Sequence, residues 1–471
     1  MHLPDEFHNY ACLKPTKNLL IFRPIQRSPT PFYRTLNPSF CYSIYLCVLI
    51  RTTALMFKQQ IIGFLFFTLF FLAIDTYVWQ GIKTITPHWS AKAKNILKWS
   101  YWGYGCAVFI FFVLIRFQIF TLSPAATKLI SAIVFAIVIA KVFWVLFLII
   151  DDLIRLFRWI YQYFFTDIPS APDQPGGINR LKFLQYTGLG VGAAFIGTAI
   201  WGIFKGAHNY TIHRKTIKIA GLPNAFKGLK ILQLSDIHSG SFWDREAVAA
   251  GIKLVNEQKA DMVFFTGDLV NDRSDEIVPW MDLFGQISAP LGVFSTLGNH
   301  DYGDYVPWPT PQAKEKNLAD LISHHKTMGW DILNDEHRVI EKDGEKLCIV
   351  GVQNWSAKAR FPKYGNLQKA LKNAPADSVK LLLSHDPSHW REQVVGKQTD
   401  IALTFAGHTH GMQFGIDSKF YRWSPVKYVY KEWLDLYTEN NQHLYVNRGF
   451  GYLGYPGRMG IYPEITVITL A

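Results

Sequence analysis

Cysteine is scarce in this chain and nearly absent from its second half. The 471 residues include five cysteines, and Cys348 is the only one between residues 205 and 471. No disulfide can form within that half, and a structural zinc site built from cysteine thiolates is not expected there. The stability of residues 205–471 must therefore come from a hydrophobic core, for which a segment of this length is ample.

The second half of the chain also has almost no net charge. The whole chain has a net charge of +12, but residues 1–204 hold 18 Lys and Arg against 7 Asp and Glu, whereas residues 205–471 hold 30 against 29. The sequence has no Lys/Arg-rich run and no basic stacking platform, so no nucleic-acid partner is expected. The basic excess flanks apolar segments in the first half, where it acts as a topology signal.

Long apolar segments dominate that first half. Four of them approach or exceed the roughly 20 residues that a membrane-spanning helix needs. They are Ile61–Ile82, Tyr101–Leu122, Ala125–Ile150 and Phe183–Phe204. The fourth is rich in small residues, with Gly188 and Gly192 spaced for close helix packing, and its alternative is a buried helix of a soluble domain. We predict a multi-pass protein of a bacterial-type inner or cell membrane, with the lipid bilayer as its partner.

Composition divides the chain into five segments. Residues 1–55 are polar and proline-rich, and we expect them to be disordered or to lie upstream of a true start at Met56. The remaining segments are a block of three spans at 56–165, a Pro/Gly-rich linker at 166–180, a fourth transmembrane or anchor helix at 181–204 and a globular domain at 205–471.

Five short polar motifs follow strand-like runs in the globular domain. They are Asp236-Ile-His238, Gly267-Asp268, Gly298-Asn299-His300-Asp301, Ser384-His385 and Gly407-His408-Thr-His410. An apolar run that ends in such residues is typical of a site at the carboxyl edge of an α/β sheet. Carboxylate, imidazole and amide ligands without thiolate suit divalent ions such as Mn, Fe, Zn or Mg. The motifs therefore predict a metal site.

The candidate ligands are too many for one ion. They are Asp236, His238, Asp268, Asn299, His385, His408 and His410. Two divalent ions roughly 3.5–4 Å apart, bridged by one carboxylate, would use all of them and leave room for a bridging hydroxide. A lone residue such as His385 is more often structural, so the inference depends on the complete ordered set.

This ordered set resembles the signature of the calcineurin-like metallophosphoesterase family: D-x-H, G-D, G-N-H-[DE], a lone His and G-H-x-H. The ending VNRGFGYLGYPGRMGIYPEITVITL resembles the tail of the membrane-anchored YkuE/YaeI-type branch. The resemblance implies a four-layer α/β/β/α sandwich with two mixed sheets. In this chain the sandwich would follow an all-α transmembrane region of about four helices.

The resemblance also implies roles for the motif residues. Asp236, His238 and His410 would hold one ion, Asn299, His385 and His408 would hold the other, and Asp268 would bridge them. His300 would protonate the leaving oxygen.

Asp301 would orient His300, or would simply cap a turn. Arg448 or Arg458 would contact substrate phosphate, with a structural role as the alternative. The family often has an acid three residues after the bridging Asp, and this chain has Asn271 there. The remaining polar residues near the motifs are expected at the surface or at helix starts; they are Asp386, His389, His324 and His325.

These features predict a membrane-bound, dinuclear, metal-dependent phosphoesterase acting on a phosphoester or phosphodiester through a metal-bridging hydroxide. The alternatives are a nucleotide-lipid pyrophosphatase of the UDP-2,3-diacylglucosamine hydrolase type and, from another class, a membrane receptor or transporter component with a binding-only domain. An aromatic and basic segment at 414–437 suits the headgroup level of a bilayer and indicates a lipid-linked substrate. The competing interpretation is that its aromatics pack the domain core.

Overall fold

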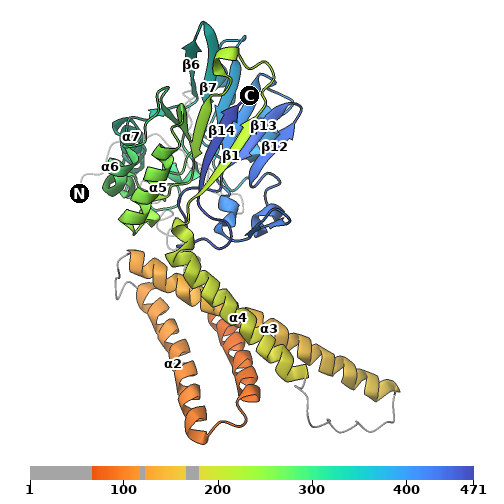
Figure 1. The fold of residues 1–471 in the computed structure, drawn as a ribbon. Coiled ribbons are helices and arrows are strands. Elements are labelled where there is room, and N and C mark those ends of the chain that lie inside the picture. Colours follow the sequence, from red (N-terminus) through yellow and green to blue (C-terminus); the bar gives the residue numbers. More distant parts are fainter. Residues whose placement is uncertain (1–65, 117–121, 123, 166–179) are drawn as a thin grey trace, which may run out of the picture. The chain divides into compact units, whose positions relative to one another are not determined.

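A computed structural model describes residues 66–116, 122, 124–165 and 180–471 (Figure 1). The chain divides into two units, residues 1–83 and 84–471. Residues 1–55, Met56 and nearly all of the predicted linker at 166–180 lie outside the described residues, so the predictions for them stay predictions.

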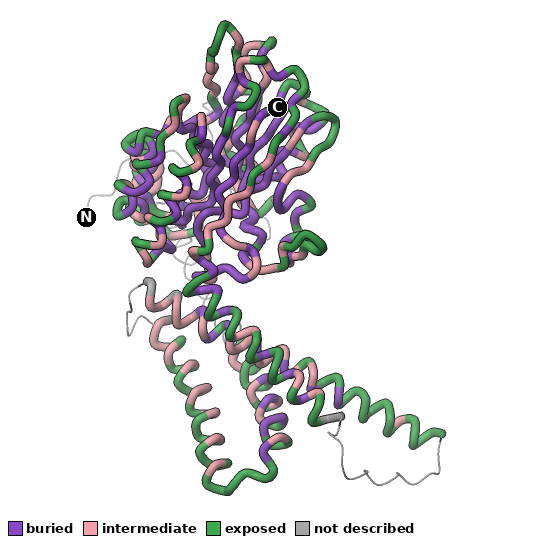
Figure 2. The backbone as a smooth tube through the Cα atoms, viewed as in Figure 1, coloured by how far each residue is buried: buried purple, intermediate pink, exposed green. Residues whose placement is uncertain are grey.

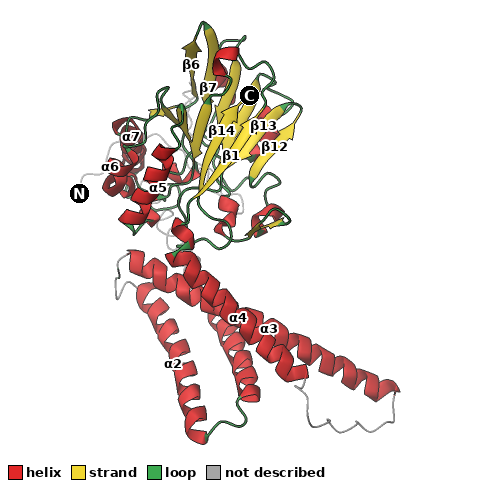
Figure 3. Cartoon of the chain, viewed as in Figure 1, coloured by secondary structure: helices red, strands yellow, loops and turns green. Residues whose placement is uncertain are grey.

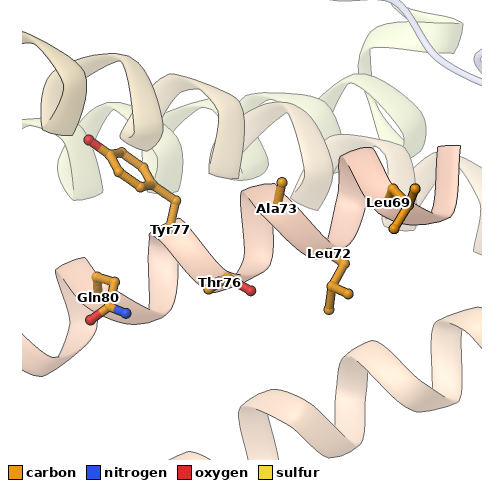
Figure 4. A pocket seen from close by; sticks show the side chains of 6 residues that line it. All are labelled: Leu69, Leu72, Ala73, Thr76, Tyr77 and Gln80. Atoms are coloured by element: carbon orange, nitrogen blue, oxygen red, sulfur yellow. The ribbon is translucent and has the colours of Figure 1, made fainter. Parts of the chain in front are cut away.

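The first unit contains most of a helix that is described from residue 66 to residue 85 and coincides largely with the first predicted span. Its large side chains Phe66, Phe67 and Phe70 are exposed, as expected for a helix that faces lipid. A shallow hollow on this helix is lined by Leu69, Leu72, Ala73, Thr76, Tyr77 and Gln80 (Figure 4). None of these six side chains belongs to the polar motifs, so the hollow is unrelated to the predicted metal site.

The second unit begins with three long helices, which are α2 (Ala91–Arg116), α3 (Pro124–Phe165) and α4 (Arg180–Phe204). Each contains a stretch long and apolar enough to cross a membrane. Two boundaries differ from the prediction: α2 begins at Ala91 instead of Tyr101, and α3 continues past Ile150 to Phe165. Many of their apolar side chains are exposed (Figure 2), a pattern that suits a lipid surrounding.

Small residues let α3 and α4 pack closely. A Cβ added at Gly188 would meet Trp144 and Phe147 at 3.0 Å, and one added at Gly192 would meet the Ala140 carbonyl at 3.1 Å. Both glycines of the predicted packing motif therefore face α3, and that prediction is confirmed.

Two six-stranded sheets form the globular domain. The first has the order β1 (Thr211–Ile217), β14 (Glu464–Leu470), β2 (Lys230–Leu234), β3 (Met262–Phe265), β4 (Val293–Ser295) and β5 (Asp331–Ile332). Its neighbours are parallel except for β14 and β2. Leu234 pairs with Phe265, so the residues that follow β2 and β3 leave the sheet at the same edge.

The second sheet has the order β12 (Asp435–Glu439), β13 (Gln442–Val446), β9 (Ile401–Ala406), β8 (Val379–Leu383), β7 (Glu345–Gly351) and β6 (Glu336–Lys342). Its four inner strands are parallel, and the outer pairs are antiparallel. A separate two-stranded hairpin joins β10 (Ile416–Asp417) to β11 (Arg422–Trp423).

The two sheets face each other across an apolar core, in which Phe264 and Phe405 meet edge to face at 4.9 Å. The outer face of the first sheet packs against α5 (Arg245–Glu257), α6 (Met281–Phe284) and α7 (Pro311–Thr327). The outer face of the second packs against α8 (Leu367–Leu371) and the turn at Trp390–Val394. Figure 3 shows α5, α6 and α7 beside the strands. The predicted α/β/β/α layering is therefore confirmed.

Within the second unit, α4 is joined directly to the last loop of the domain. The Tyr455 hydroxyl donates to the Ala199 carbonyl, and the Arg458 amide donates to the Gly202 carbonyl at 3.1 Å. A Cβ at Gly206 would fall on the Arg458 carbonyl, so only glycine permits this approach.

Candidate metal centre

Each candidate ligand lies just after the end of a strand. Asp236 and His238 follow β2, Asp268 follows β3, His385 follows β8, and His408 and His410 follow β9. Asn299 begins a short 3-10 helix, Asn299–Tyr302, after β4. The carboxyl edges of both sheets thus contribute to one site, as the motif positions predict.

Five of these ligand residues have a left-handed backbone. Their φ angles lie between 49° and 69°, and the residues are Asp236, His238, Asp268, His408 and His410. This conformation costs a residue with a Cβ about 1 kcal/mol or more, and such residues cluster at functional sites. The tight turns that it produces direct the side chains back across the strand ends toward one another.

A first cluster consists of Asp236, His238 and His410. The Nε2 atoms of the two histidines are 3.0 Å apart, and His410 Nε2 lies 3.1 Å from Asp236 Oδ1. Asp236 and His238 are fully buried, and His410 is 7% exposed. The backbone amide of His408 donates to both oxygens of Asp236, which holds that carboxylate in place.

A second cluster consists of Asp268, His385 and His408. His385 Nε2 lies 3.1 Å from Asp268 Oδ2 and 3.3 Å from His408 Nδ1. Asn299 joins this cluster, because its Oδ1 is 2.7 Å from His408 Nδ1. The Thr266 carbonyl accepts from His385 Nδ1 at 2.7 Å, so the Nε2 lone pair of a neutral His385 faces the cluster.

Asp268 lies between the two clusters. Its Oδ2 is 3.1 Å from His385 Nε2 in the second cluster and 3.5 Å from His238 Nε2 in the first. Its Oδ1 accepts the backbone amide of His300 at 2.8 Å. One carboxylate oxygen therefore faces imidazoles of both clusters, as a bridging ligand would.

The two clusters differ in their electrostatics. Burial lowers the pKa of His238 well below its ordinary value. Burial acts the same way on His385, but the carboxylates of Asp268 and Asp236 outweigh it and raise the pKa of His385 to about 10. Against the effect of burial, His385 and His300 hold the pKa of Asp268 well below its usual range. Both carboxylates of the site are thus ionised at neutral pH.

Motif glycines make room for these carboxylates. A Cβ at Gly298 would fall on Asp268 Oδ1, and a Cβ at Gly407 would fall on Asp236 Oδ2. Gly267 has a φ of 93° and packs against Gly298. The glycines therefore permit close backbone approach to the ligands.

His300 lies at the site, but Asp301 does not orient its ring. The Asn271 carbonyl accepts from His300 Nδ1 at 2.7 Å, and the two oxygens of Asp301 accept backbone amides of Asp268, Leu269 and Gly298 at 2.8–2.9 Å. Asp301 therefore organises the turns that carry Asp268 and Asn299, and these contacts favour the turn-capping role over the orienting one. Because position 271 contributes a backbone carbonyl, the departure from the family's acid there leaves the contact to His300 intact.

For Arg448 and Arg458, the contacts favour the structural role over contact with substrate phosphate. Their exposed fractions are 1% and 0%. Arg448 forms ion pairs with Glu464 at 2.5 Å and Asp417 at 2.7 Å. Arg458 donates to the carbonyls of Gly449 and Gly451. Both guanidinium groups stabilise the loops behind the site, and their hydrogen-bonding capacity is used there.

Two residues that the sequence interpretation missed support His408. The outer nitrogen of this histidine, Nε2, lies 2.8 Å from the Tyr430 hydroxyl and 3.5 Å from Asp386 Oδ2, and the hydroxyl donates to that oxygen at 3.0 Å. A carboxylate behind a histidine ligand fixes its tautomer and increases its basicity. Asp386 was expected at the surface and is 1% exposed. Its place next to His385 was the available signal.

Two further histidines expected at the surface are buried. His389 is bonded to Ser384 and Gln393, and His325 is bonded to Ser295. Each of these histidines lies between a strand and the helix or turn that covers it, and it is therefore shielded from solvent. Of the residues expected at the surface or at helix starts, His324 alone is partly exposed.

Aromatic and basic residues line the side of the second cluster. The Phe361 ring packs 4.7 Å from that of His408, and the Tyr305 hydroxyl accepts from Asn299 Nδ2 at 2.9 Å. Lys358 Nζ lies 5.3 Å from the Tyr430 ring, and the Arg360 guanidinium lies 5.7 Å from the Phe361 ring. Burial raises the pKa of Tyr305 to about 12, and the charge of Arg360 opposes that rise.

The donor set fits divalent cations. In each cluster, three ligand atoms from carboxylates and imidazoles lie within 4.8 Å of one another. His238 Nδ1 is buried without a hydrogen-bond partner among the described residues, and the Nε2 of the same ring faces the cluster. Borderline-hard ions such as Mn, Fe or Zn match carboxylate and imidazole donors.

Two family models match the chain. Residues 229–412 match "Calcineurin-like phosphoesterase", and residues 58–207 match "Probable Calcineurin-like phosphoesterase, transmembrane domain". The first match contains all seven candidate ligands. The second contains α2, α3 and α4, together with the helix that is described from residue 66 onward.

The names of two relatives mention a metallophosphoesterase, and one of them also mentions a transmembrane protein. A "Transmembrane protein with metallophosphoesterase domain" of Danio rerio is 28% identical over 281 residues, which cover 58% of this chain and 60% of the relative. The "Uncharacterized metallophosphoesterase YkuE" of Bacillus subtilis is 29% identical over 307 residues, which cover 62% of this chain and 98% of the relative. The chain thus spans about 60% of the length of the Danio rerio protein.

Among solved structures, a phosphopantetheinyl hydrolase of Mycobacterium tuberculosis aligns with a TM-score of 0.30 and 13% identity, covering 47% of this chain and 88% of that one.

Proposed function

We propose that this chain, a membrane protein that carries a calcineurin-like phosphoesterase domain, is a dinuclear metal-dependent hydrolase of phosphoesters or phosphodiesters. The observation that carries the proposal is the convergence of seven metal-type side chains from two sheets on one edge of the domain. A binding-only domain would have no need of His300 beside this set, and no contact described above favours the nucleotide-lipid pyrophosphatase alternative.

The ligand roles follow from the two clusters. Asp236, His238 and His410 would hold one ion, and Asn299, His385 and His408 would hold the other. Asp268 would bridge them through the oxygen that faces both histidine groups. When bound, two divalent ions would polarise the phosphoryl oxygens and lower the pKa of a bound water toward neutrality.

His300 would act as the general acid. Because a carbonyl can only accept, the Asn271 contact requires a proton on His300 Nδ1. Nε2 is then the nitrogen that gains and loses a proton, and the protonated ring can donate to a leaving oxygen. The edge-to-face contact between the rings of His300 and His238, with centroids 5.1 Å apart, keeps the acid next to the first cluster.

Metal removal and restoration test the proposed activity. The full chain, purified in detergent and loaded with Mn²⁺, should hydrolyse bis(p-nitrophenyl) phosphate. Exhaustive chelation should abolish that hydrolysis, and added Mn²⁺ should restore it, with metal content measured in parallel. An unchanged rate after the metal has been removed would contradict the proposal.

The segment at 414–437 bears on the physical state of the substrate. Its aromatics divide into two groups: Tyr430 and Trp433 are buried in a small core, whereas Phe420 is 98% exposed and Tyr428 is 73% exposed. Lys419 and Lys427 stand next to these exposed rings. Exposed apolar rings mixed with cations suit the headgroup region of a bilayer.

We therefore extend the proposal to a lipid-linked or membrane-proximal phosphoester. The direct junction between α4 and the domain keeps the site near the membrane that α4 would span. Phe420→Ser together with Tyr428→Ser should reduce hydrolysis of a phosphoester embedded in anionic vesicles more than hydrolysis of a soluble diester. Trp423 is a poorer probe, because its ring packs against Phe414. Equal losses on both substrates would remove the support for a lipid-linked one.

A further inference from the structure

The segment between β7 and α8 places two cations beside the second ligand cluster. Lys358 lies over the Tyr430 ring, and the Tyr430 hydroxyl contacts His408 Nε2 at 2.8 Å. Arg360 lies over Phe361, whose ring packs against His408 at 4.7 Å. Each cation is therefore one aromatic ring away from the same candidate ligand.

These two cations lack the ion pairs that occupy Arg448. Arg448 is buried against two carboxylates, whereas Arg360 is exposed and Lys358 is half-buried. Within the described part of the chain, no Asp or Glu oxygen lies within 4.0 Å of either cation. Their charge is thus available to a ligand, and each charged group lies over an aromatic ring, a contact that limits its motion.

The rings separate the cations from the metal ligands. Phe361 and Tyr430 both contact His408. Lys358 and Arg360 lie over the rings of these residues, one residue further from the ligand. The cations are therefore better placed for a second negative group of the same molecule than for the reacting phosphate. Guanidinium and ammonium groups both bind such oxyanions.

We propose that Lys358 and Arg360 form an anion subsite that binds a second phosphate or carboxylate of the substrate, beyond the ester that is cleaved. This inference rests on the proposed phosphoesterase function and names the class of substrate: a phosphoester that carries an additional oxyanion. Arg360 takes the recognition role that sequence reasoning gave to Arg448 and Arg458.

A matched pair of substrates tests the subsite. Thymidine 5′-(p-nitrophenyl phosphate) carries one negative group, and its 3′-phosphate derivative carries a second. The Mn²⁺-loaded full chain should show a KM about tenfold lower for the derivative, the effect of one good charge-assisted contact. In the variant K358Q/R360Q, the KM for the derivative should rise about tenfold more than the KM for the parent ester. The variant K358Q/R360K, which keeps a cation at position 360, should retain part of the preference for the derivative that K358Q/R360Q loses.

Lys363 supplies the control. It lies on the same segment, but its Nζ is 4.6 Å from the Trp355 ring, away from His408. Lys363→Gln should therefore leave both KM values unchanged.

The outcomes separate the two proposals. If the parent ester is not hydrolysed at all, the phosphoesterase function fails. If it is hydrolysed but the 3′-phosphate gives no preference, or if K358Q/R360Q lowers kcat equally on both esters, the subsite inference is overturned and the two residues act on the reacting phosphate or on the loop.

Discussion

The two ligand clusters are built from similar residues but have opposite surroundings. The first, with Asp236, His238 and His410, is enclosed, and a buried guanidinium of Arg458 lies 3.4 Å from the outer nitrogen of His410. The second, with Asp268, His385 and His408, has a buried carboxylate, Asp386, behind the outer nitrogen of His408. A carboxylate behind a histidine ligand fixes its tautomer and makes it a stronger base, and only the second cluster has this arrangement among the described residues.

The two clusters also differ in how accessible they are from outside the domain. His408 is partly exposed, and the aromatic and basic residues of the 353–364 segment gather on its side. We infer that the first cluster mainly holds its ion and that substrate approaches the second. The charge of Asp268, shared between them, is the feature on which both would depend.

Removing that shared charge should have the largest effect. Asp268→Asn keeps the size of the side chain but takes away the negative charge that faces imidazoles of both clusters. We expect loss of two-ion occupancy and a fall in activity of about three orders of magnitude, since metal-based charge stabilisation supplies several kcal/mol. Metal analysis and initial rates measure the two effects.

The control is Asp320→Asn, which removes an exposed carboxylate on α7 that pairs with Lys316. It should change neither metal content nor rate. Unchanged two-ion content in Asp268→Asn would show that the clusters do not share this ligand.

His300→Ala should separate catalysis from metal holding. The substitution removes the proposed acid and leaves the ligands of both clusters in place. We expect a rate about a hundredfold lower for an alkyl diester, a smaller loss for a p-nitrophenyl ester, and unchanged metal content, because a poor leaving group needs the proton most. Full activity on the alkyl diester would mean that another group supplies the proton.

Asp386→Asn should sharpen the contrast between the clusters. Weakening the carboxylate behind His408 should reduce metal affinity at the second cluster about tenfold to a hundredfold and leave the first nearly unaffected. Competition with a chelator should therefore release one ion at lower chelator concentration than in the unmodified protein. Tyr430→Phe keeps the carboxylate, so it should reduce metal affinity at the second cluster by less than Asp386→Asn does. Simultaneous weakening of both ions would argue against separate surroundings.

The smallest expected effect is on how the stability of the metal-free protein depends on pH. Folding raises the pKa of His385 from its ordinary value near 6.5 to about 10, so its stabilising contribution is complete below pH 6.5 and is lost as pH rises toward 10. The thermal midpoint of the metal-free protein should fall by about 5 °C between pH 7 and pH 9.5. His385→Asn should remove most of that slope. Metal-loaded protein should lack it, because a ligating histidine is already deprotonated.

Much of the fold follows from local sequence. Apolar runs such as KILQL predict buried strands, the motifs stand where those strands end, and Gly188 and Gly192 predict a packed membrane helix. The start of α2 and the end of α3 were predicted less accurately. A prediction based on apolar residues identifies the membrane-spanning stretch, but not the more polar turns that extend the helix beyond it.

For the site, the sequence by itself determined which residue types meet, since each ligand is tied to a strand end and parallel strands end at a common edge. Only the tertiary structure decided the partners of the remaining polar residues. Arg448 pairs with Glu464, Asp301 accepts turn amides, and His408 meets Asp386 and Tyr430. These contacts depend on which segments, distant in the chain, share a desolvated space. There most polar groups find a hydrogen-bond partner, and spacing along the sequence does not record which partner that is.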